Sequence, residues 1–279
     1  EGDVMPAYYG ETANSCRLEE CLLKASDMIG WKEKGMRTVM PDGKIRARGV
    51  AMAMQGSSIS NCDVGSVTVK LSDEGTYHIT VGCTDMGTGC DTIIAQFAAD
   101  VLETPIDNIS VYGVDTDISP YDSGSYASST TYLTGMAAVK ACEQLRERII
   151  ALAAVRMNKD ASALTFDGEN VIDESDGAKM SLFDIATASM CNNEISLEVT
   201  YSHSSPVSPP PFMAACAEIE ADPETGAIEL LDYTACVDCG TVVNTNLARV
   251  QTEGGLLQGI GMTLYDDIWY HERGKNLTN

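Results

Sequence analysis

The order of strand-like and helix-like segments constrains the fold of this chain more than any other feature. Two pairs of segments alternate polar and apolar side chains around a turn signal, which predicts two β-hairpins. The four segments are 65–71, 76–82, 214–221 and 228–237. Apolar positions also recur at helical spacing over 91–102 and 131–157. Strand pairs that alternate with helices in this way predict an α+β fold, with two lobes of mixed sheets packed against helices.

Shorter patterns complete this expectation and set the lobe boundary. Further strands are expected over 45–55, 109–112, 164–166, 170–172 and 195–201, and further helices over 14–31, 182–190 and 247–265. The polar connection near residue 160 lies between the two groups of elements. We therefore expect a first α+β lobe over residues 1–160 and a second over residues 161–279.

The charge balance excludes two classes of partner. The chain carries 18 Lys plus Arg against 41 Asp plus Glu, a formal net charge of −23. Nucleic acids and anionic membranes bind proteins through basic patches, so neither is an expected partner. The longest uncharged apolar runs are also too short to span a bilayer.

The basic residues are absent from long stretches, which limits how an anion could bind. No Lys or Arg lies between Lys70 and Lys140, where ten acidic residues occur, and none lies between Lys179 and Arg249. An anion bound by these stretches must use backbone N–H groups and helix N-termini.

Cysteine and histidine usage favours structural roles in a reducing compartment. The ten cysteines are scattered, and Cys236 and Cys239 form a C-x-x-C without a second such pair or a suitable histidine. The pattern therefore favours buried thiols over a metal or redox site and indicates a cytoplasmic protein. The three histidines, His78, His203 and His271, lack a second ligand at metal spacing, and no metal-binding residue is predicted.

The first segment with chemical content runs from Gly82 to Asp91, with the sequence GCTDMGTGCD. A strand ends, small residues follow and a helix begins, so backbone N–H groups and a helix N-terminus are directed to one place. This arrangement predicts an anion or cofactor site. The alternative, of equal weight on the pattern alone, is a tight strand-to-helix connection without a ligand.

The second segment is the Ser- and Thr-rich stretch from Asp115 to Tyr132, which leads directly into the predicted long helix. Residues 126–129 would then lie at the N-terminus of that helix, with hydroxyl and amide groups on one side. A surface loop with a helix N-cap is the alternative, and it is favoured when the segment is considered in isolation.

The third segment, QTEGGLLQGIG from Gln251 to Gly261, lies on the last predicted helix. Each helical glycine costs about 1 kcal/mol relative to alanine, so the four glycines should serve close packing or the approach of a ligand. Gln251 and Gln258 are seven positions apart and share a helix face. Helix packing through the glycines alone would explain the same pattern.

Taken together, these motifs make the chain resemble the molybdenum-cofactor-binding subunit of the xanthine dehydrogenase and aldehyde oxidase family of molybdenum hydroxylases. The resemblance covers about residues 45–270. The matching motifs are DMGTG at 85–89, Gln96-x-x-Ala-x-x-Leu102, DTD at 115–117, SGSYASSTTYLTG at 123–135, VDCG at 237–240 and QTEGGLLQGIG at 251–261.

The resemblance implies which residues contact the cofactor, a molybdopterin cytosine dinucleotide carrying molybdenum. These residues are Gly87, Thr88, Gly89, Tyr126, Ala127, Ser128, Ser129 and Gln251. The chain departs from the family at Thr88, where a glutamine is usual, and at Ser129, where an arginine is common. A threonine hydroxyl is shorter than the glutamine amide it replaces.

The resemblance also implies what this chain lacks. The catalytic glutamate of the family, in a Gly-x-Gly-Glu motif, is expected after residue 279, so no residue of this chain is assigned a catalytic role. The chain has neither an iron–sulfur cysteine pattern nor a flavin motif. Iron–sulfur and FAD subunits or domains, together with the remaining molybdopterin-binding segments, are therefore implied partners.

The implied reaction is the oxidative hydroxylation of an N-heterocycle, a small-molecule substrate, with water as the source of oxygen. Oxidation of an aldehyde or of carbon monoxide is the alternative within the family. A non-catalytic scaffold lobe that binds only partner subunits is an alternative of another class. A simple phosphate-binding module is disfavoured because residues 71–139 contain no Lys or Arg.

Overall fold

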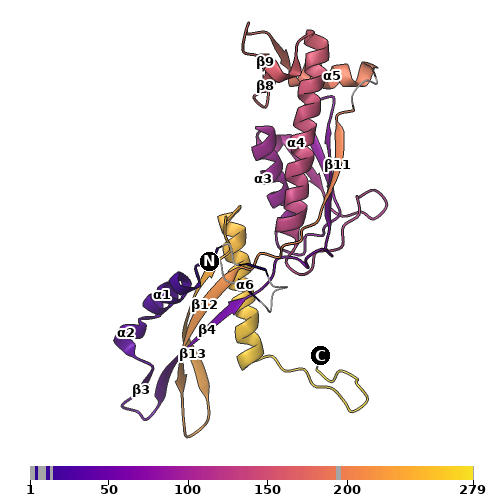
Figure 1. Cartoon of the computed structure of the whole chain (residues 1–279). Helices are drawn as coiled ribbons and strands as arrows, with labels where there is room; N and C mark the ends of the chain where they lie inside the picture. The colour runs from indigo at the N-terminus through magenta and orange to yellow at the C-terminus, as the bar shows by residue number, and fades with distance from the viewer. Residues whose placement is uncertain (1–3, 6–10, 13–14, 193–195, 279) are drawn as a thin grey trace. The chain divides into compact units, whose positions relative to one another are not determined.

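The computed structural model describes residues 4–5, 11–12, 15–192 and 196–278, and it confirms the predicted α+β class (Figure 1). The chain divides into two compact units, residues 1–240 and residues 241–279. The first unit contains all the sheets and the second contains one long helix.

A four-stranded sheet in the first unit has the order β11-β5-β6-β7. Its strands are β11 (Glu198–His203), β5 (Gly65–Leu71), β6 (Tyr77–Val81) and β7 (Ile109–Tyr112). The predicted hairpin of β5 and β6 is confirmed, with Val69 opposite Ile79. Neighbouring β6 and β7 run parallel, whereas β11 and β5 run antiparallel.

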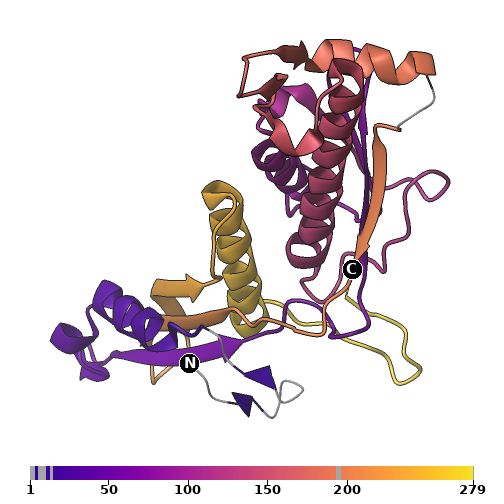
Figure 2. The same cartoon turned by 45° about the horizontal axis from the view of Figure 1, so that its top comes forward.

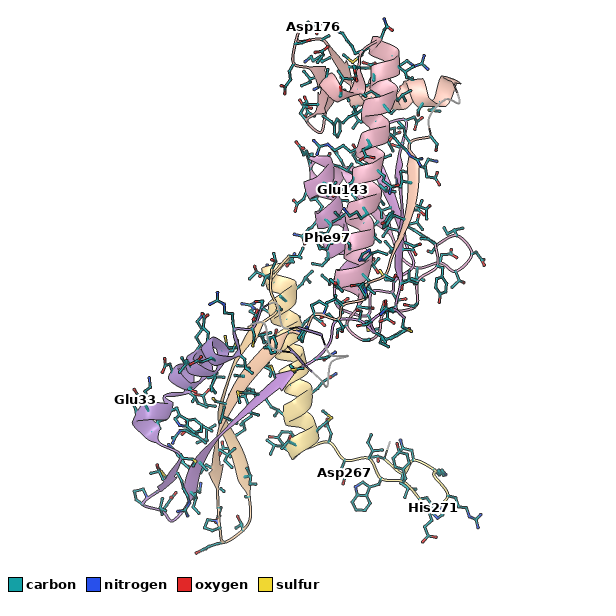
Figure 3. All side chains as sticks on the ribbon, in the orientation of Figure 1. Glu33, Phe97, Glu143, Asp176, Asp267 and His271 are labelled. Atoms are coloured by element: carbon teal, nitrogen blue, oxygen red, sulfur yellow. The ribbon has the colours of Figure 1, made fainter. Side chains whose placement is uncertain are left out.

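Two helices cover one face of this sheet: α3 (Cys90–Leu102) and α4 (Thr130–Met157). Strands β5 and β6 alternate as predicted, so Val67, Val69 and Ile79 enter the core between sheet and helices. The side chains of the opposite face include Thr68 and Thr200, whose hydroxyls lie 2.7 Å apart. The helices pack closely, because a Cβ at Gly135 on α4 would lie 2.6 Å from the ring of Phe97 on α3 (Figure 3).

A second four-stranded sheet has the order β13-β12-β4-β3. Its strands are β3 (Arg37–Val39), β4 (Ile45–Met54), β12 (Phe212–Ala221) and β13 (Ile228–Asp238), and it packs against α1 (Leu18–Ile29). Beside α1, the short helix α2 (Trp31–Lys34) is fixed to the sheet by the buried Arg48. The Arg48 guanidinium donates to the carbonyls of Lys34 and Gly35 and pairs with Glu218 at 2.5 Å.

Smaller elements complete the first unit. Strands β8 (Leu164–Phe166), β9 (Asn170–Asp173) and β10 (Lys179–Ser181) form an antiparallel sheet, followed by α5 (Leu182–Asn192). Single 3-10 turns precede β7 (η1, Ile106–Asn108) and β8 (η2, Ala161–Ala163). Near the N-terminus, β1 (Val4–Met5) pairs with β2 (Glu11–Thr12). Figure 2 shows β8–β10 and α5 together at the C-terminal end of α4.

The second unit consists of α6 (Thr245–Leu264) and the tail that follows it. The Asn244 side chain caps the helix by accepting from the N–H of Leu247 at 3.0 Å. The apolar side chains of α6 remain largely exposed, with Leu257 at 67% and Met262 at 70%. Asp267 and His271 lie on the tail beyond α6 (Figure 3).

Strand pairing joins segments that are far apart in the sequence. Both four-stranded sheets combine strands from before and after residue 160, since β5 pairs with β11 and β4 pairs with β12. The division into residues 1–160 and 161–279 stays a prediction, and the strand pairing gives it no support. Among the described helices, none combines the length and apolarity needed to cross a membrane.

Candidate cofactor-binding site

The topology of the first sheet brings several loops to one end of its strands. Strands β6, β7 and β11 finish at this end of the sheet and β5 begins there, because β5 is antiparallel to β6 and β11. The loops attached to these strand ends are therefore neighbours: residues 55–64, 82–89, 113–129 and 204–211. Two of the three segments that the sequence singled out, 82–91 and 115–132, begin in these loops.

The turn from Gly82 to Gly89 folds around its own carboxylate. Asp85 Oδ1 accepts from the N–H of Gly87 at 2.9 Å and from the N–H of Gly89 at 3.1 Å. Gly89 then begins α3 with a left-handed φ of 75°. The N–H groups expected to be free for a ligand are thus directed at Asp85.

The pKa values of two neighbouring carboxyl groups shift in opposite directions. Desolvation of the exposed Asp85 disfavours its charge, but hydrogen bonds from the N–H groups of this turn outweigh that effect and lower its pKa. For Asp91, burial and then the charge of Asp85 raise the pKa. The N-terminus of α3 therefore already holds an internal anion.

The second loop is tied to this turn by hydrogen bonds and close packing. Ser125 Oγ accepts from the N–H of Thr84 at 2.8 Å and donates to the Thr84 carbonyl at 2.9 Å. A Cβ at Gly82 would lie 2.4 Å from the Pro120 carbonyl oxygen, so only glycine permits this approach. On its other side, Ser123 bonds the backbone N–H and carbonyl of Val64.

Two consecutive residues of this loop, Ala127 and Ser128, adopt left-handed conformations, with φ of 52° and 56°. Such values are uncommon for residues other than glycine, and neighbouring loop 55–64 supports them here. Ser58 N–H donates to the Ala127 carbonyl at 2.8 Å, and the Gln55 side-chain amide donates to Ser128 Oγ at 2.7 Å.

These conformations leave donors unused. Among the described residues, no acceptor pairs with the backbone N–H of Ala127 or of Ser128. The following residue, Ser129, is buried, donates its hydroxyl to the Tyr126 carbonyl at 2.9 Å and begins the 28-residue helix α4. Because the first turn of α4 carries no acidic residue, an external anion could bind here.

The structure brings together seven of the eight predicted site residues, all in the two joined loops. Gly87, Thr88 and Gly89 belong to the first loop, and residues 126–129 belong to the second. The eighth, Gln251, lies on α6 in the second compact unit. Its contact with the cofactor stays a prediction, as do the roles of the other seven.

Several residues that shape the site were not among the predicted cofactor contacts. Asp85 carries a readable signal, because an aspartate two residues before a glycine often accepts from the backbone of a turn. Gln55, Ser58 and Ser125 carry no such signal. Their partners lie far along the chain, and local sequence patterns do not report long-range contacts.

A possible metal-ligand group lies beside the first loop and is explained without an ion. The ligand atoms of Asp85, Cys90 and Asp91 lie within 4.8 Å of one another. Asp85 is occupied by backbone N–H groups, and the Cys90 thiol donates to Asp91 Oδ1 at 3.7 Å. Within the part of the chain that the structure describes, Cys236 and Cys239 belong to no such group.

Buried polar atoms without a partner lie next to the second loop, which fits a ligand site. Ser58 Oγ and Asp63 Oδ1 are buried, and within the described ranges neither finds a hydrogen-bond partner. Ser58 Oγ and the backbone N–H groups of Ala127 and Ser128 can donate to an anionic group, whereas Asp63 Oδ1 is an acceptor and requires a donor. The residues present therefore fit a polar, anionic cofactor.

Comparison with known proteins identifies the class. The family model of the molybdopterin cofactor-binding domain matches residues 24–279, and the chain belongs to this family. The chain is 36% identical over 268 residues to the "Probable hypoxanthine oxidase XdhD" of Escherichia coli (strain K12), covering 96% of this chain and 28% of that protein.

One further relative and one solved structure are similar to this chain. The chain is 28% identical over 277 residues to the xanthine dehydrogenase molybdenum-binding subunit of Escherichia coli O157:H7, covering 96% of this chain and 37% of that protein. Its fold matches the crystal structure of quinoline 2-oxidoreductase from Pseudomonas putida 86 with a TM-score of 0.83 and 22% identity, over 99% of this chain and 38% of that one. The chain thus spans about a third of the length of the proteins it resembles.

Proposed function

We propose that this chain forms part of the cofactor-binding region of a cytoplasmic molybdenum hydroxylase that oxidatively hydroxylates an N-heterocycle, with water as the source of oxygen. The observation that carries this proposal is a pair of hydrogen bonds between Ser125 and the Thr84 backbone. They join the two loops that contain the cofactor motifs at one end of the sheet. Membership in the molybdopterin cofactor-binding domain family supports it, as do relatives whose names describe oxidation of hypoxanthine and xanthine.

The residues of this chain would bind and orient the cofactor. When bound, the molybdenum pterin supplies the two-electron redox chemistry. In its cytosine dinucleotide form the cofactor also carries a pyrophosphate, and the N–H groups of Ala127 and Ser128 offer anion donors that need no Lys or Arg. Gly87, Thr88 and Gly89 would instead form a fixed wall, because Asp85 already engages N–H groups of that turn.

The electrons would leave through iron–sulfur and FAD subunits or domains, and further molybdopterin-binding segments would complete the site. The length of the relatives supports this division of labour, since the chain covers 28% and 37% of two of them. Gln251 on α6 would also contact the cofactor. Oxidation of an aldehyde or of carbon monoxide is the alternative within the family.

Measuring the cofactor on two forms of the protein tests the proposal. Molybdenum and released CMP are quantified on the purified 279-residue chain and on the same chain within its longer flanking sequence. We expect both at a stoichiometric level on the longer form. Absence of molybdenum and pterin from the longer form would contradict the proposal and favour a scaffold that only binds partner subunits.

A further inference from the structure

Strand β4 has an open edge along more than half of its length. On one side it pairs with β12 from Ile45 to Met54, but on the other side β3 pairs only with Ile45–Ala47. Beyond that point the N–H of Arg48 donates to the Met36 carbonyl at 2.9 Å. Within the described residues no strand continues along the rest of this edge.

The alternation of an extended strand identifies the backbone groups on this edge. Successive residues direct their N–H and C=O groups to opposite sides. The backbone N–H of Arg48 points toward the β3 side of the strand. The backbone N–H and C=O groups of Val50, Met52 and Met54 therefore point to the same side, which is open. In the ranges that the structure describes, the backbone N–H and C=O groups of these three residues have no hydrogen-bond partner on that side.

The side chains along this edge are apolar and accessible. Val50 is 46% exposed, Met52 is 56% exposed and Met54 is 42% exposed. No charged residue lies between Arg48 and Asp63. Exposed edge strands are normally protected by charges, prolines or bulges, so a bare apolar edge is a template for another strand.

The register shows which faces an added strand would meet. Val50 lies opposite Cys216 and Met54 lies opposite Phe212, and both of these β12 side chains are buried. The apolar face of β4 therefore continues a face that is already buried on β12. Gly49, Ala51 and Ala53 form the other face, where the small side chains allow close approach by a neighbouring layer.

We propose that the edge of β4 from Val50 to Met54 receives an extended segment from the remaining part of the molybdopterin-binding region, as an additional strand of the β13-β12-β4-β3 sheet. The occupant would place apolar side chains beside Val50, Met52 and Met54 and would carry no proline at its paired positions. The length of the relatives supports this source, because the chain spans only 28% to 37% of two of them. The inference rests on the proposed function, because the occupant belongs to the larger assembly that this function requires.

Hydrogen exchange at residue resolution tests the pairing. Exchange is measured on the isolated 279-residue chain and on the oxidoreductase assembly purified through a tag on the same chain. The outward amides of Val50, Met52 and Met54 should exchange on the order of 100-fold more slowly in the assembly. The amides of Ala51 and Ala53 face β12 and serve as an internal control that should be protected in both samples.

Two outcomes would overturn this assignment. Equal exchange of the outward amides in both samples would show that the edge stays open. Protection in the isolated chain, together with a dimer mass by light scattering, would assign the edge to a second copy of the chain. Molybdenum content is measured on the same assembly. Protected amides without molybdenum would contradict the proposed cofactor function alone, and unprotected amides with molybdenum would contradict this inference alone.

A pair of variants provides an independent measurement. M52K places a charge on the open edge, and M190K makes the same change at a methionine of α5 that is 64% exposed. Both isolated variants should retain the circular dichroism spectrum and melting temperature of the unmodified chain. The fraction of chain recovered in the assembly should fall at least several-fold for M52K and stay unchanged for M190K. Equal recovery of two folded variants would contradict the proposal.

Discussion

At the scale of single residues, the contact between the two loops of the site depends on a glycine. A Cβ at Gly82 would lie 2.4 Å from the Pro120 carbonyl oxygen and 2.5 Å from Asp122 Cβ. Neither atom is the end of a flexible side chain, because one is backbone and the other is attached directly to it. The loops can therefore approach only if residue 82 has no side chain.

We expect the substitution Gly82→Ala to destabilise the fold by about 1–3 kcal/mol, the usual cost of an extra methyl group in a packed position. Gly49→Ala is the matched control, because a Cβ at Gly49 would meet nothing within 4 Å. Urea unfolding followed by circular dichroism measures both changes. If the two variants unfold at the same urea concentration, the close approach at Gly82 does not contribute to stability.

A second residue, Asp173, makes stability depend on pH. Its carboxylate accepts from Ser175 Oγ at 2.5 Å and pairs with Lys159 Nζ at 2.9 Å. The hydroxyl hydrogen bond first, and the lysine next, lower the pKa of Asp173 from 3.8 to about 2. Because the folded state has the lower pKa, this stabilisation is present above pH 3.8 and is lost as pH falls toward 2.

Asp173→Asn should therefore be less stable than the unmodified chain at pH 7, and the difference should shrink between pH 3.8 and about 2. Thermal unfolding at a series of pH values measures the difference. Lys159→Met should remove part of the same pH dependence, since Lys159 is one of the two side-chain partners of Asp173. A difference between Asp173→Asn and the unmodified chain that stays constant down to pH 2 would contradict this account.

At the scale of elements, α4 organises the core of the first unit. Leu145 and Ile149 on this helix are fully buried, whereas Val155 on the same helix is 58% exposed. Leu145→Ala should cost about 2–5 kcal/mol, because the lost transfer free energy adds to the cost of a cavity. Val155→Ala should cost far less. Denaturant unfolding of both variants checks this expectation, and equal losses of stability would contradict the described packing of α4.

The extent of the elements could be predicted from the sequence because local patterns determine it. The helix expected over 131–157 is observed over Thr130–Met157, and the hairpin around Asp73-Glu74-Gly75 forms in register. The pairing of β4 with β12 could not be predicted, because the apolar pattern of residues 45–55 does not specify its partner more than 150 positions later. The proposed lobe boundary depended on such pairings.

The same distinction holds for the candidate site. Motif order identified the loops that contain residues 87–89 and 126–129, since glycines and hydroxyl residues beside a helix start are local signals. Tertiary contacts determined the rest. The pattern of residues 82–91 predicts backbone N–H groups that are free for a ligand, but the N–H groups of Gly87 and Gly89 donate to Asp85. The unused donors lie instead at Ala127 and Ser128, whose left-handed conformations depend on the neighbouring loop.

At the scale of the whole molecule, the net charge of −23 is compatible with an anionic cofactor because attraction at the site is local. Backbone N–H groups and helix N-termini supply partial positive charge over a few ångströms. The electrostatic field of exposed carboxylates is screened by water and salt over a distance of about 10 Å. The acidic surface thus disfavours extended polyanions without preventing a small anion from binding between the loops.

The hydrogen bonds between the two loops should affect how firmly the assembled protein retains its cofactor. Ser125→Ala removes both hydrogen bonds that connect Ser125 to the Thr84 backbone. Losing two hydrogen bonds of about 1 kcal/mol each should weaken retention of the cofactor by about thirtyfold. The loss is measured as molybdenum per chain by mass spectrometry and as CMP released from the pterin per chain.

Ser110→Ala on β7 is the control, because Ser110 is exposed and outside the loops. If a folded Ser125→Ala protein retains as much molybdenum as Ser110→Ala, the contact between Ser125 and Thr84 does not hold the site together.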